Sequence, residues 1–228
     1  MKDVLGQAIH DYHYQNLPAK LWIHNRYGPK ENMPIEAYFR AEEDMPDLEW
    51  HALNECRGKM LDIGAGAGSH VLELQERGYE VTALDISPLA VQVMQARGVK
   101  NAIAQDIFTY HGQQFDTIIL LMNGIGLAGN LIKLRQLLEH LKTLLAKGGQ
   151  LLFDSSDIRY LYEGKMPETS YYGEILYQYE YKNQKTEWFE WLYIHEDQLL
   201  KIADETGWNV EILYEDEFKQ FLARLTTK

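Results

Sequence analysis

The sequence predicts an α/β fold: a three-layer, doubly wound sheet of seven strands, mostly parallel with the last strand antiparallel, carrying an inserted β-hairpin. Short apolar runs alternate with helical patterns from residue 58 onward. Glycines stand where the helices must stop, and two closely spaced strand-like runs end the chain. A chain of 228 residues suffices for one complete domain. We therefore expect a single domain, with a helical lid segment at 1–57, the sheet at 58–228 and the hairpin at 171–194.

The first four strands are expected at residues 59–63, 80–85, 101–105 and 116–121. A helix at 69–77 follows the first strand, and Gly78 is placed to end it in a left-handed conformation. The next helix has the clearest signals, because Ser87 can cap it, Pro88 suits its first turn and Gly98 can stop it. The crossovers between parallel strands place ligands at the carboxyl ends of the strands.

A leucine stripe from residue 131 to 145 predicts a helix that ends at Lys147-Gly148-Gly149, followed by a fifth strand at 150–154. Two aromatic runs, 171–182 and 186–194, are predicted to form the hairpin, joined by Asn183-Gln184-Lys185. A helix at 196–205 and strands at 209–214 and 220–225 complete the chain. The last two strands should be antiparallel neighbours, because their short link leaves no room for a crossover helix.

Composition restricts the partners and the compartment. The formal charge of −12 would repel nucleic acids and anionic membranes, and Lys and Arg form no run. The single cysteine, Cys56, allows no intramolecular disulfide and fits a reducing cytoplasm. No apolar stretch has the length of a signal peptide or a membrane span. We expect a cytoplasmic protein that acts on a small molecule.

The segment LDIGAGAGSH, residues 61–70, places three glycines where the first strand turns into the first helix. Such a turn lets the backbone approach a ligand, and the helix N–H groups that follow favour an anionic group. A dinucleotide fingerprint needs Gly-x-Gly-x-x-Gly, but the position that should hold the third glycine is Ser69. Asp62 adds a carboxylate that suits an ammonium or sulfonium cation. The ligand is therefore expected to be partly cationic.

Two further carboxylates end neighbouring strands. Asp85 ends the second strand, where it could accept both hydroxyl protons of a ribose; helix capping is the alternative, although Ser87 already occupies that position. Asp106 ends the third strand, where it could accept from an adenine amine while Ile107 packs on the ring. A plain turn residue is an equally good interpretation of Asp106 alone.

Together, the glycine turn, Asp85, Asp106 and the loop after the fourth strand resemble the class I S-adenosylmethionine-dependent methyltransferase family. The resemblance covers residues 58–155, including FDTIILLMNGIG at 115–126 and LLAKGGQLLFD at 144–154. It implies S-adenosylmethionine as the cofactor and a methyltransferase domain at 58–228. The cofactor-binding residues that it implies are Gly64, Ala65 and Gly66 for the methionine portion, Asp85 and Ile86 for the ribose, Asp106 and Ile107 for the adenine, and Met122 or Asn123 for the methyl-donor face.

The chain departs from one subgroup of that family. Nucleic-acid amino methyltransferases usually carry Asp/Asn-Pro-Pro-aromatic after the fourth strand, whereas this chain has Asn123-Gly124-Ile125-Gly126. Base methylation is therefore disfavoured. Two other interpretations stay open, a nicotinamide-dependent oxidoreductase and a noncatalytic module that keeps only the cofactor pocket.

Methyl transfer from a sulfonium is an in-line displacement in which positioning supplies much of the acceleration, so no catalytic residue is assigned. If a proton must leave the acceptor, a nearby His or Tyr could take it. The candidates precede the sheet, in the segment expected to close over the cofactor as a lid: His10, His13, Tyr14, Trp22, Tyr38 and Arg40. His10 and His13 lack the partner pattern of a metal site and are expected at the surface.

The predicted hairpin carries an aromatic patch. Tyr177, Tyr179 and Tyr181 alternate along one strand, and Phe189, Trp191 and Tyr193 along the other. Packing against the domain is one interpretation, and a substrate wall or a homodimer surface is the other.

Overall fold

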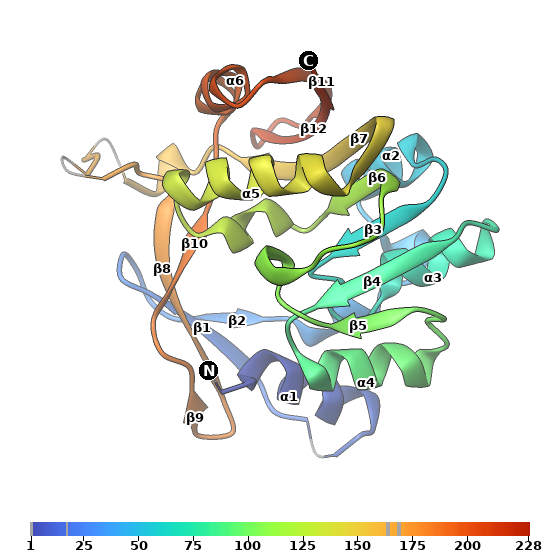
Figure 1. Cartoon of the computed structure of the whole chain (residues 1–228). Coiled ribbons are helices and arrows are strands. Elements are labelled where there is room, and N and C mark those ends of the chain that lie inside the picture. Colours follow the sequence, from blue (N-terminus) through green and yellow to red (C-terminus); the bar gives the residue numbers. More distant parts are fainter. Residues whose placement is uncertain (1, 17, 163–164, 168–169) are drawn as a thin grey trace. The chain divides into compact units, whose positions relative to one another are not determined.

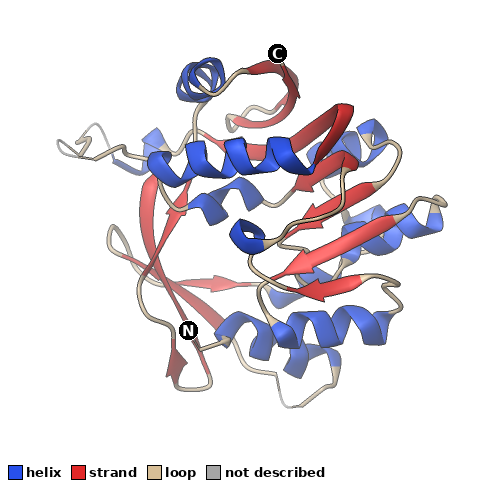
Figure 2. Ribbon diagram, in the orientation of Figure 1, coloured by secondary structure: helices blue, strands red, loops and turns tan. Residues whose placement is uncertain are grey.

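A computed structural model describes residues 2–16, 18–162, 165–167 and 170–228. Its larger sheet has seven strands in the order β11-β12-β7-β6-β3-β4-β5. Figure 2 draws the strands in red and the helices in blue. The pairs β4/β5 and β6/β7 are parallel, whereas β12 runs antiparallel to both β7 and β11. The predicted fold class is confirmed. The strands are β3 Met60–Ile63, β4 Val81–Asp85, β5 Ala102–Ala104, β6 Phe115–Leu120, β7 Leu145–Ser156, β11 Trp208–Glu215 and β12 Gln220–Thr227.

The chain groups into two compact units, each assembled from separate stretches of sequence. The first unit contains residues 1–45, 61–110 and 176–189, and the second contains 46–60, 111–175 and 190–228. The segment 1–57, expected to act as one lid, is divided between them at residue 45.

In the first unit, the predicted helix signals are confirmed. Helix α3 (Ser69–Glu76) is followed by Gly78 at a φ of +89°. Helix α4 (Pro88–Arg97) begins after Ser87, whose Oγ accepts the N–H of Ala90 at 3.0 Å. It ends at Gly98 in the left-handed conformation, which costs glycine little. Local sequence chemistry therefore accounts for both boundaries of α4.

The N-terminal segment is only partly helical, which corrects the prediction. Helix α1 (Val4–His13) packs beside α4 (Figure 1), but strands β1 (Leu21–Asn25) and β2 (Glu31–Met33) follow it. Strand β1 pairs antiparallel with β2 and with β8 (Glu174–Tyr181). The predicted hairpin therefore contributes to a second sheet whose main path is β10-β8-β1-β2. The pairing of β1 with β8 is non-local, so sequence periodicity carried no sign of it.

The hairpin turn lies one residue earlier than predicted. Lys182 and Asn183 both have positive φ, at +44° and +64°, as a two-residue type I′ turn requires. Gln184 and Lys185, expected in the link, form the short strand β9, which pairs with the end of β8. Strand β10 is confined to Phe189–Leu192. Asn183 at a left-handed position is the signal that favours this register.

In the first unit, the aromatic patch is partly core. Tyr181 is buried in a cluster with Val4, Ala8 and Leu21, and Tyr179 packs against that cluster. Tyr179 also contacts Phe189, with 5.1 Å between ring centroids. Core packing therefore explains Tyr179 and Tyr181, the aromatic residues near the carboxyl end of β8.

The second unit contains α2 (Asp47–Glu55), α5 (Leu131–Leu144) and α6 (Glu196–Glu205), the last as predicted. Helix α5 ends at Leu144 instead of continuing to Lys147, because Leu145 already pairs with Phe115 in the sheet. Gly148, at a φ of +78°, lies within β7 and does not stop the helix. Among the described residues, no helix combines the length and apolar character needed to cross a membrane.

Candidate functional site

The glycine turn between β3 and α3 exposes its backbone, because three of its residues have no side chain. Gly64, Gly66 and Gly68 have φ values of +75°, +57° and +83°, which disfavour other residue types. The N–H groups of Gly64 and Ala65 both donate to the carbonyl oxygen of Leu84, at 2.8 and 3.2 Å. A Cβ added to Gly64 would meet nothing within 4 Å, so open space lies beside it. The turn is anchored to β4 and can be approached closely by a ligand.

Tyr38, in the 3-10 helix η1 (Ile35–Phe39), lies against this turn. A Cβ on Gly66 would be only 2.9 Å from Cδ1 of Tyr38. The Ser69 hydroxyl also donates to the Tyr38 carbonyl oxygen, at 2.8 Å. Part of the N-terminal segment therefore contacts the predicted cofactor turn.

Asp85 holds the same turn from the end of β4. Its Oδ2 accepts the N–H of Gly66 at 2.9 Å, and its Oδ1 accepts the N–H of Ser87 at 2.8 Å. Burial of the carboxylate raises its pKa to about 6, although these backbone donors act in the opposite direction. Each carboxylate oxygen can accept more than one hydrogen bond, so Asp85 can also bind ligand hydroxyls.

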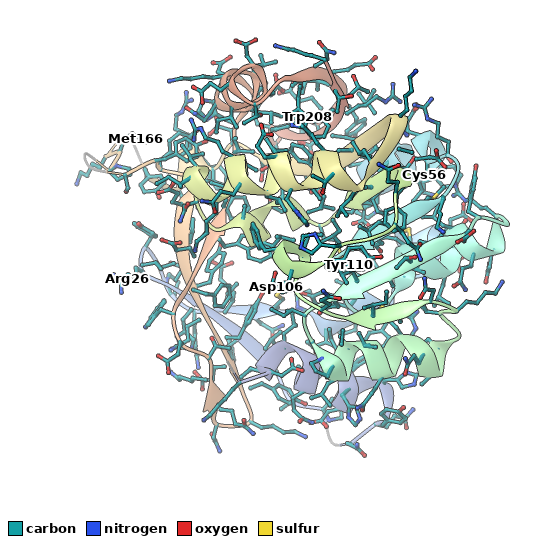
Figure 3. All side chains as sticks on the ribbon, viewed as in Figure 1. Arg26, Cys56, Asp106, Tyr110, Met166 and Trp208 are labelled. Atoms are coloured by element: carbon teal, nitrogen blue, oxygen red, sulfur yellow. The ribbon has the colours of Figure 1, made fainter. Side chains whose placement is uncertain are left out.

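The two isoleucines of the predicted cofactor site differ in exposure. Ile86 is 72% exposed, whereas Ile107 is only 5% exposed and belongs to the core. Asp106, labelled in Figure 3, follows β5 and caps the short helix η3 (Ile107–Thr109) by accepting the N–H of Phe108 at 2.9 Å. The turn interpretation of Asp106 is therefore correct, and it leaves carboxylate lone pairs for an adenine amine. Ile86 provides the exposed apolar surface.

Asp62 is the next-to-last residue of β3 and is buried, with 2% of its surface exposed. Among the described residues, its Oδ2 is buried without a hydrogen-bond partner. Desolvation raises its pKa to about 6; His70 opposes this shift, and the charge of Asp85 adds to it. A buried, unpaired carboxylate oxygen is costly to the fold. Its chemistry fits the ammonium group of an amino-acid ligand.

Met122 and Asn123 lie in the second unit, directly after β6. Both have positive φ, +58° and +54°, which is uncommon for residues other than glycine. The N–H of Asn123 donates to both oxygens of Asp154, and its side-chain oxygen accepts from the Ser155 hydroxyl at 3.0 Å. Sequence reasoning missed Asp154 and Ser155 as site residues, although a carboxylate at the end of a buried strand was a usable signal.

These two residues line an open cleft of about 840 Å³ within the second unit. Two of its aromatic side chains, Tyr160 and Phe218, are 71% and 74% exposed. The remaining residues around the cleft are Ser156, Asp157, Arg159, Tyr193, Glu217, Lys219 and Gln220. Tyr193, from the predicted aromatic patch, is therefore a cleft wall.

A histidine that sequence reasoning missed lies in a smaller neighbouring cleft, which shares Asp157, Arg159 and Lys219 with the first. His195 Nδ1 is 2.7 Å from the hydroxyl of Tyr171. Burial lowers the pKa of His195, which favours a neutral ring at neutral pH.

The candidates predicted from the N-terminal segment are dispersed. His13 stacks on Phe39, with 6.3 Å between ring centroids, and Tyr14 is largely exposed. Trp22 lies on β1 beneath the ammonium of Lys30, 4.4 Å from the ring centre. Of these aromatic side chains, Tyr38 is the one whose contact with the glycine turn is observed.

Comparisons with known proteins agree with this geometry. The model of a methyltransferase domain family matches residues 35–212. A crystal structure of an S-adenosylmethionine-dependent methyltransferase from Bacteroides fragilis, in complex with S-adenosyl-L-homocysteine, is 40% identical, with a TM-score of 0.92 over 99% of this chain and 95% of that chain.

More distant relatives share the fold. S-adenosylmethionine-bound CalS10, an amino pentose methyltransferase from Micromonospora echinaspora, is 15% identical, with a TM-score of 0.57 over 87% of this chain and 99% of that one. A curated relative from Geobacillus sp. (strain WCH70), also named as a methyltransferase, is 24% identical over 102 residues, and the match spans 42% of this chain and 41% of that protein. These findings decide against the nicotinamide-dependent oxidoreductase, and the chain belongs to the class I S-adenosylmethionine-dependent methyltransferase family.

Proposed function

We propose that this enzyme transfers the methyl group of S-adenosylmethionine to a small organic acceptor held in the cleft of the second unit. The observation that carries the proposal is that Met122 and Asn123, the residues implied to face the methyl donor, line this cleft. Its volume of about 840 Å³ lies in the ordinary range for small-molecule sites. The net charge of −12 disfavours a nucleic-acid acceptor.

The roles of the cofactor residues follow from their chemistry. The unpaired oxygen of Asp62 accepts from the cofactor ammonium, and the backbone at Gly64, Ala65 and Gly66 borders the methionine portion. Asp85 accepts from the ribose hydroxyls. Ile86 packs on the adenine ring, and the Asp106 carboxylate accepts from its exocyclic amine.

The transfer itself needs alignment more than acid–base chemistry. The acceptor lone pair forms a bond to the methyl carbon while the carbon–sulfur bond breaks, and its electron pair neutralises the sulfonium. Holding the acceptor atom about 3 Å from the methyl carbon supplies much of the acceleration. A hydroxyl or ammonium acceptor must also lose one proton. The neutral ring of His195, in the cleft beside the larger one, is the group that we propose to take it.

The amino pentose methyltransferase CalS10 and a glycopeptide N-methyltransferase, MtfA, share this architecture. At 15% and 16% identity, they support the fold alone. The aromatic rim of Tyr160 and Phe218 favours an acceptor with an apolar or planar part.

Two measurements test the proposal. Calorimetric titration of cofactor-stripped protein with S-adenosylmethionine, S-adenosylhomocysteine and NAD should give micromolar binding of the first two, lost in Asp85→Ala. Release of S-adenosylhomocysteine should then be screened over small amines, phenols and hydroxy acids, with RNA and a denatured protein extract as parallel acceptors. For an active small molecule, Tyr160→Ala/Phe218→Ala should raise the acceptor KM and leave cofactor affinity unchanged. Turnover with RNA or protein alone would overturn the acceptor class.

A further inference from the structure

Asp3, near the start of the chain, is connected through Ser87 to Asp85, the carboxylate proposed to bind the cofactor ribose. The hydrogen bonds of this connection all lie within the first unit. It caps helix α1, because its Oδ1 accepts the N–H of Gly6 at 3.0 Å. Its Oδ2 accepts the hydroxyl proton of Ser87 at 2.6 Å. Ser87 in turn donates its backbone N–H to Asp85 Oδ1 at 2.8 Å. Asp3 and Ser87 thus link the N-terminal helix to Asp85.

The direction of the Ser87 hydroxyl proton is determined by its partners. Ser87 Oγ accepts the N–H of Ala90, as the N-cap of α4, and donates to Asp3. A hydroxyl has one proton to donate, so the bond to Asp3 directs it away from Asp85, two residues earlier. A charged acceptor at this distance makes a strong hydrogen bond.

The close approach of α1 to Ser87 depends on Gly6. A Cβ at Gly6 would lie 2.0 Å from Ser87 Oγ and 2.3 Å from Asp3 Oδ1. Any larger residue would displace one of the two bonded groups. The sequence of α1 therefore accommodates the contact between Asp3 and Ser87, and α1 packs along α4 behind it.

We propose that Asp3 is a positioning residue for the cofactor: by binding the Ser87 hydroxyl, it keeps the free lone pairs of Asp85 available to the ribose hydroxyls. Without Asp3, the Ser87 hydroxyl loses its charged acceptor and is free to rotate toward the Asp85 carboxylate, two residues earlier in the chain, where it competes with the ribose. This inference rests on the proposed role of Asp85.

The electrostatics around Asp85 give the proposal a second consequence. Asp3, the N-cap of α1, is a charged group that acts on this carboxylate, while Asp85 raises and His70 of α3 lowers the pKa of Asp62 in β3. The negative charge of Asp3 contributes to the raised pKa of Asp85. Removing that charge should lower the pKa of Asp85 and move the pH midpoint of cofactor binding to a lower value.

The test is calorimetric titration of the full chain with S-adenosylmethionine and S-adenosylhomocysteine, from pH 5 to 8. In Asp3→Asn, we expect about five- to tenfold weaker binding of both at neutral pH, because one ligand hydrogen bond is contested. The pH midpoint of binding should fall. Adding Ser87→Ala to Asp3→Asn should restore part of the affinity, since the competing hydroxyl is then gone.

Asp11→Asn is the matched control. Asp11 also lies on α1 and is buried, but it binds Lys182 at 2.7 Å and Tyr181 at 3.2 Å, away from Ser87. The Asp11→Asn substitution should weaken the packing of α1 and leave cofactor affinity within about twofold of wild type. Equal weakening by Asp11→Asn and Asp3→Asn would mean that α1 docking alone matters, which overturns the proposal.

The remaining outcomes separate this proposal from the proposed site. Wild-type affinity and an unchanged pH midpoint in Asp3→Asn, together with loss of binding in Asp85→Ala, would overturn the role of Asp3 alone. Full binding by Asp85→Ala would instead overturn the assigned cofactor site. Failure of the Ser87→Ala addition to recover any affinity would refute the competition between the hydroxyl and the ribose.

Discussion

The backbone N–H of Asn123 donates to both carboxylate oxygens of Asp154, at 3.0 and 2.8 Å, and this pair holds the loop after β6 in a left-handed conformation. Gln220 donates to the same carboxylate at 3.2 Å. Positive φ at two consecutive residues other than glycine costs free energy, which surrounding bonds must offset. Asp154 provides those bonds, so a buried acid behind the cleft determines the shape of its floor.

Asp154→Ala should therefore lower the free energy of unfolding by about 2–3 kcal/mol, because it leaves the buried Asn123 N–H without an acceptor. Asp154→Asn keeps one acceptor oxygen and should lower it by less than half as much. Urea denaturation at pH 7.5 measures both. Equal destabilisation by the two variants would contradict this account, since it would indicate that the charge, and not the acceptor atom, supports the loop.

Tyr38 should support cofactor affinity through its ring. Its ring lies against Gly66, and its hydroxyl is 3.7 Å from the sulfur of Met33. Tyr38→Ala should weaken S-adenosylmethionine binding about tenfold, by exposing the turn to water, and Tyr38→Phe should bind like wild type. Calorimetric titration measures both. Unchanged affinity in Tyr38→Ala would remove the support for a lid in this segment.

Cofactor affinity should decrease as the pH falls through about 6. Both Asp85 and Asp62 have a pKa raised to about 6 by burial, and in the proposed site each accepts hydrogen bonds from the cofactor only as a carboxylate. S-adenosylhomocysteine titrations at pH 5.0, 6.0 and 7.5 measure the change. Asp85→Asn should bind more weakly throughout and keep part of the pH dependence, owing to Asp62. An affinity that is constant over this range would contradict the proposed contacts.

Sequence chemistry predicted the parts of the fold that depend on local signals. The cap at Ser87, the left-handed Gly98 and the three glycines of the turn all act within a few residues, and the structure has them as expected. The pairing of β1 with β8 joins Ile23 to Tyr179, across most of the chain. No local pattern specifies such a contact, so the N-terminal segment was predicted as helical.

The site shows the same division. Asp85 was predictable because it ends a strand next to a recognisable turn. Exposure was not predictable: Ile86 is exposed and Ile107 is buried, so we propose for Ile86 the adenine contact that the sequence suggested for Ile107. His195 was missed because it precedes an ordinary helix in the sequence. Its contact with Tyr171 and its position in a cleft are visible only in the structure.

The buried carboxylate of Asp62 should lower the free energy of unfolding while it raises the affinity for the cofactor. Its pKa is about 6 in the folded chain, above its ordinary value of 3.8, so the unfolded chain binds fewer protons between pH 4 and 6. Its contribution to stability therefore falls as the pH rises through this window, and the full penalty is present above pH 6. Asp62→Asn removes the buried charge and should raise the free energy of unfolding by about 1–3 kcal/mol at pH 7.5.

The same substitution should weaken S-adenosylmethionine binding about tenfold, because a neutral amide no longer attracts the cofactor ammonium. Urea denaturation at pH 4.5 and 7.5 should show the gain in stability only at the higher pH. Ser69→Ala, which alters the neighbouring helix start without removing a charge, serves as the control and should show no such pH dependence. If Asp62→Asn were less stable than wild type at pH 7.5 and bound the cofactor normally, Asp62 would be a structural acid whose unpaired oxygen has no part in cofactor recognition.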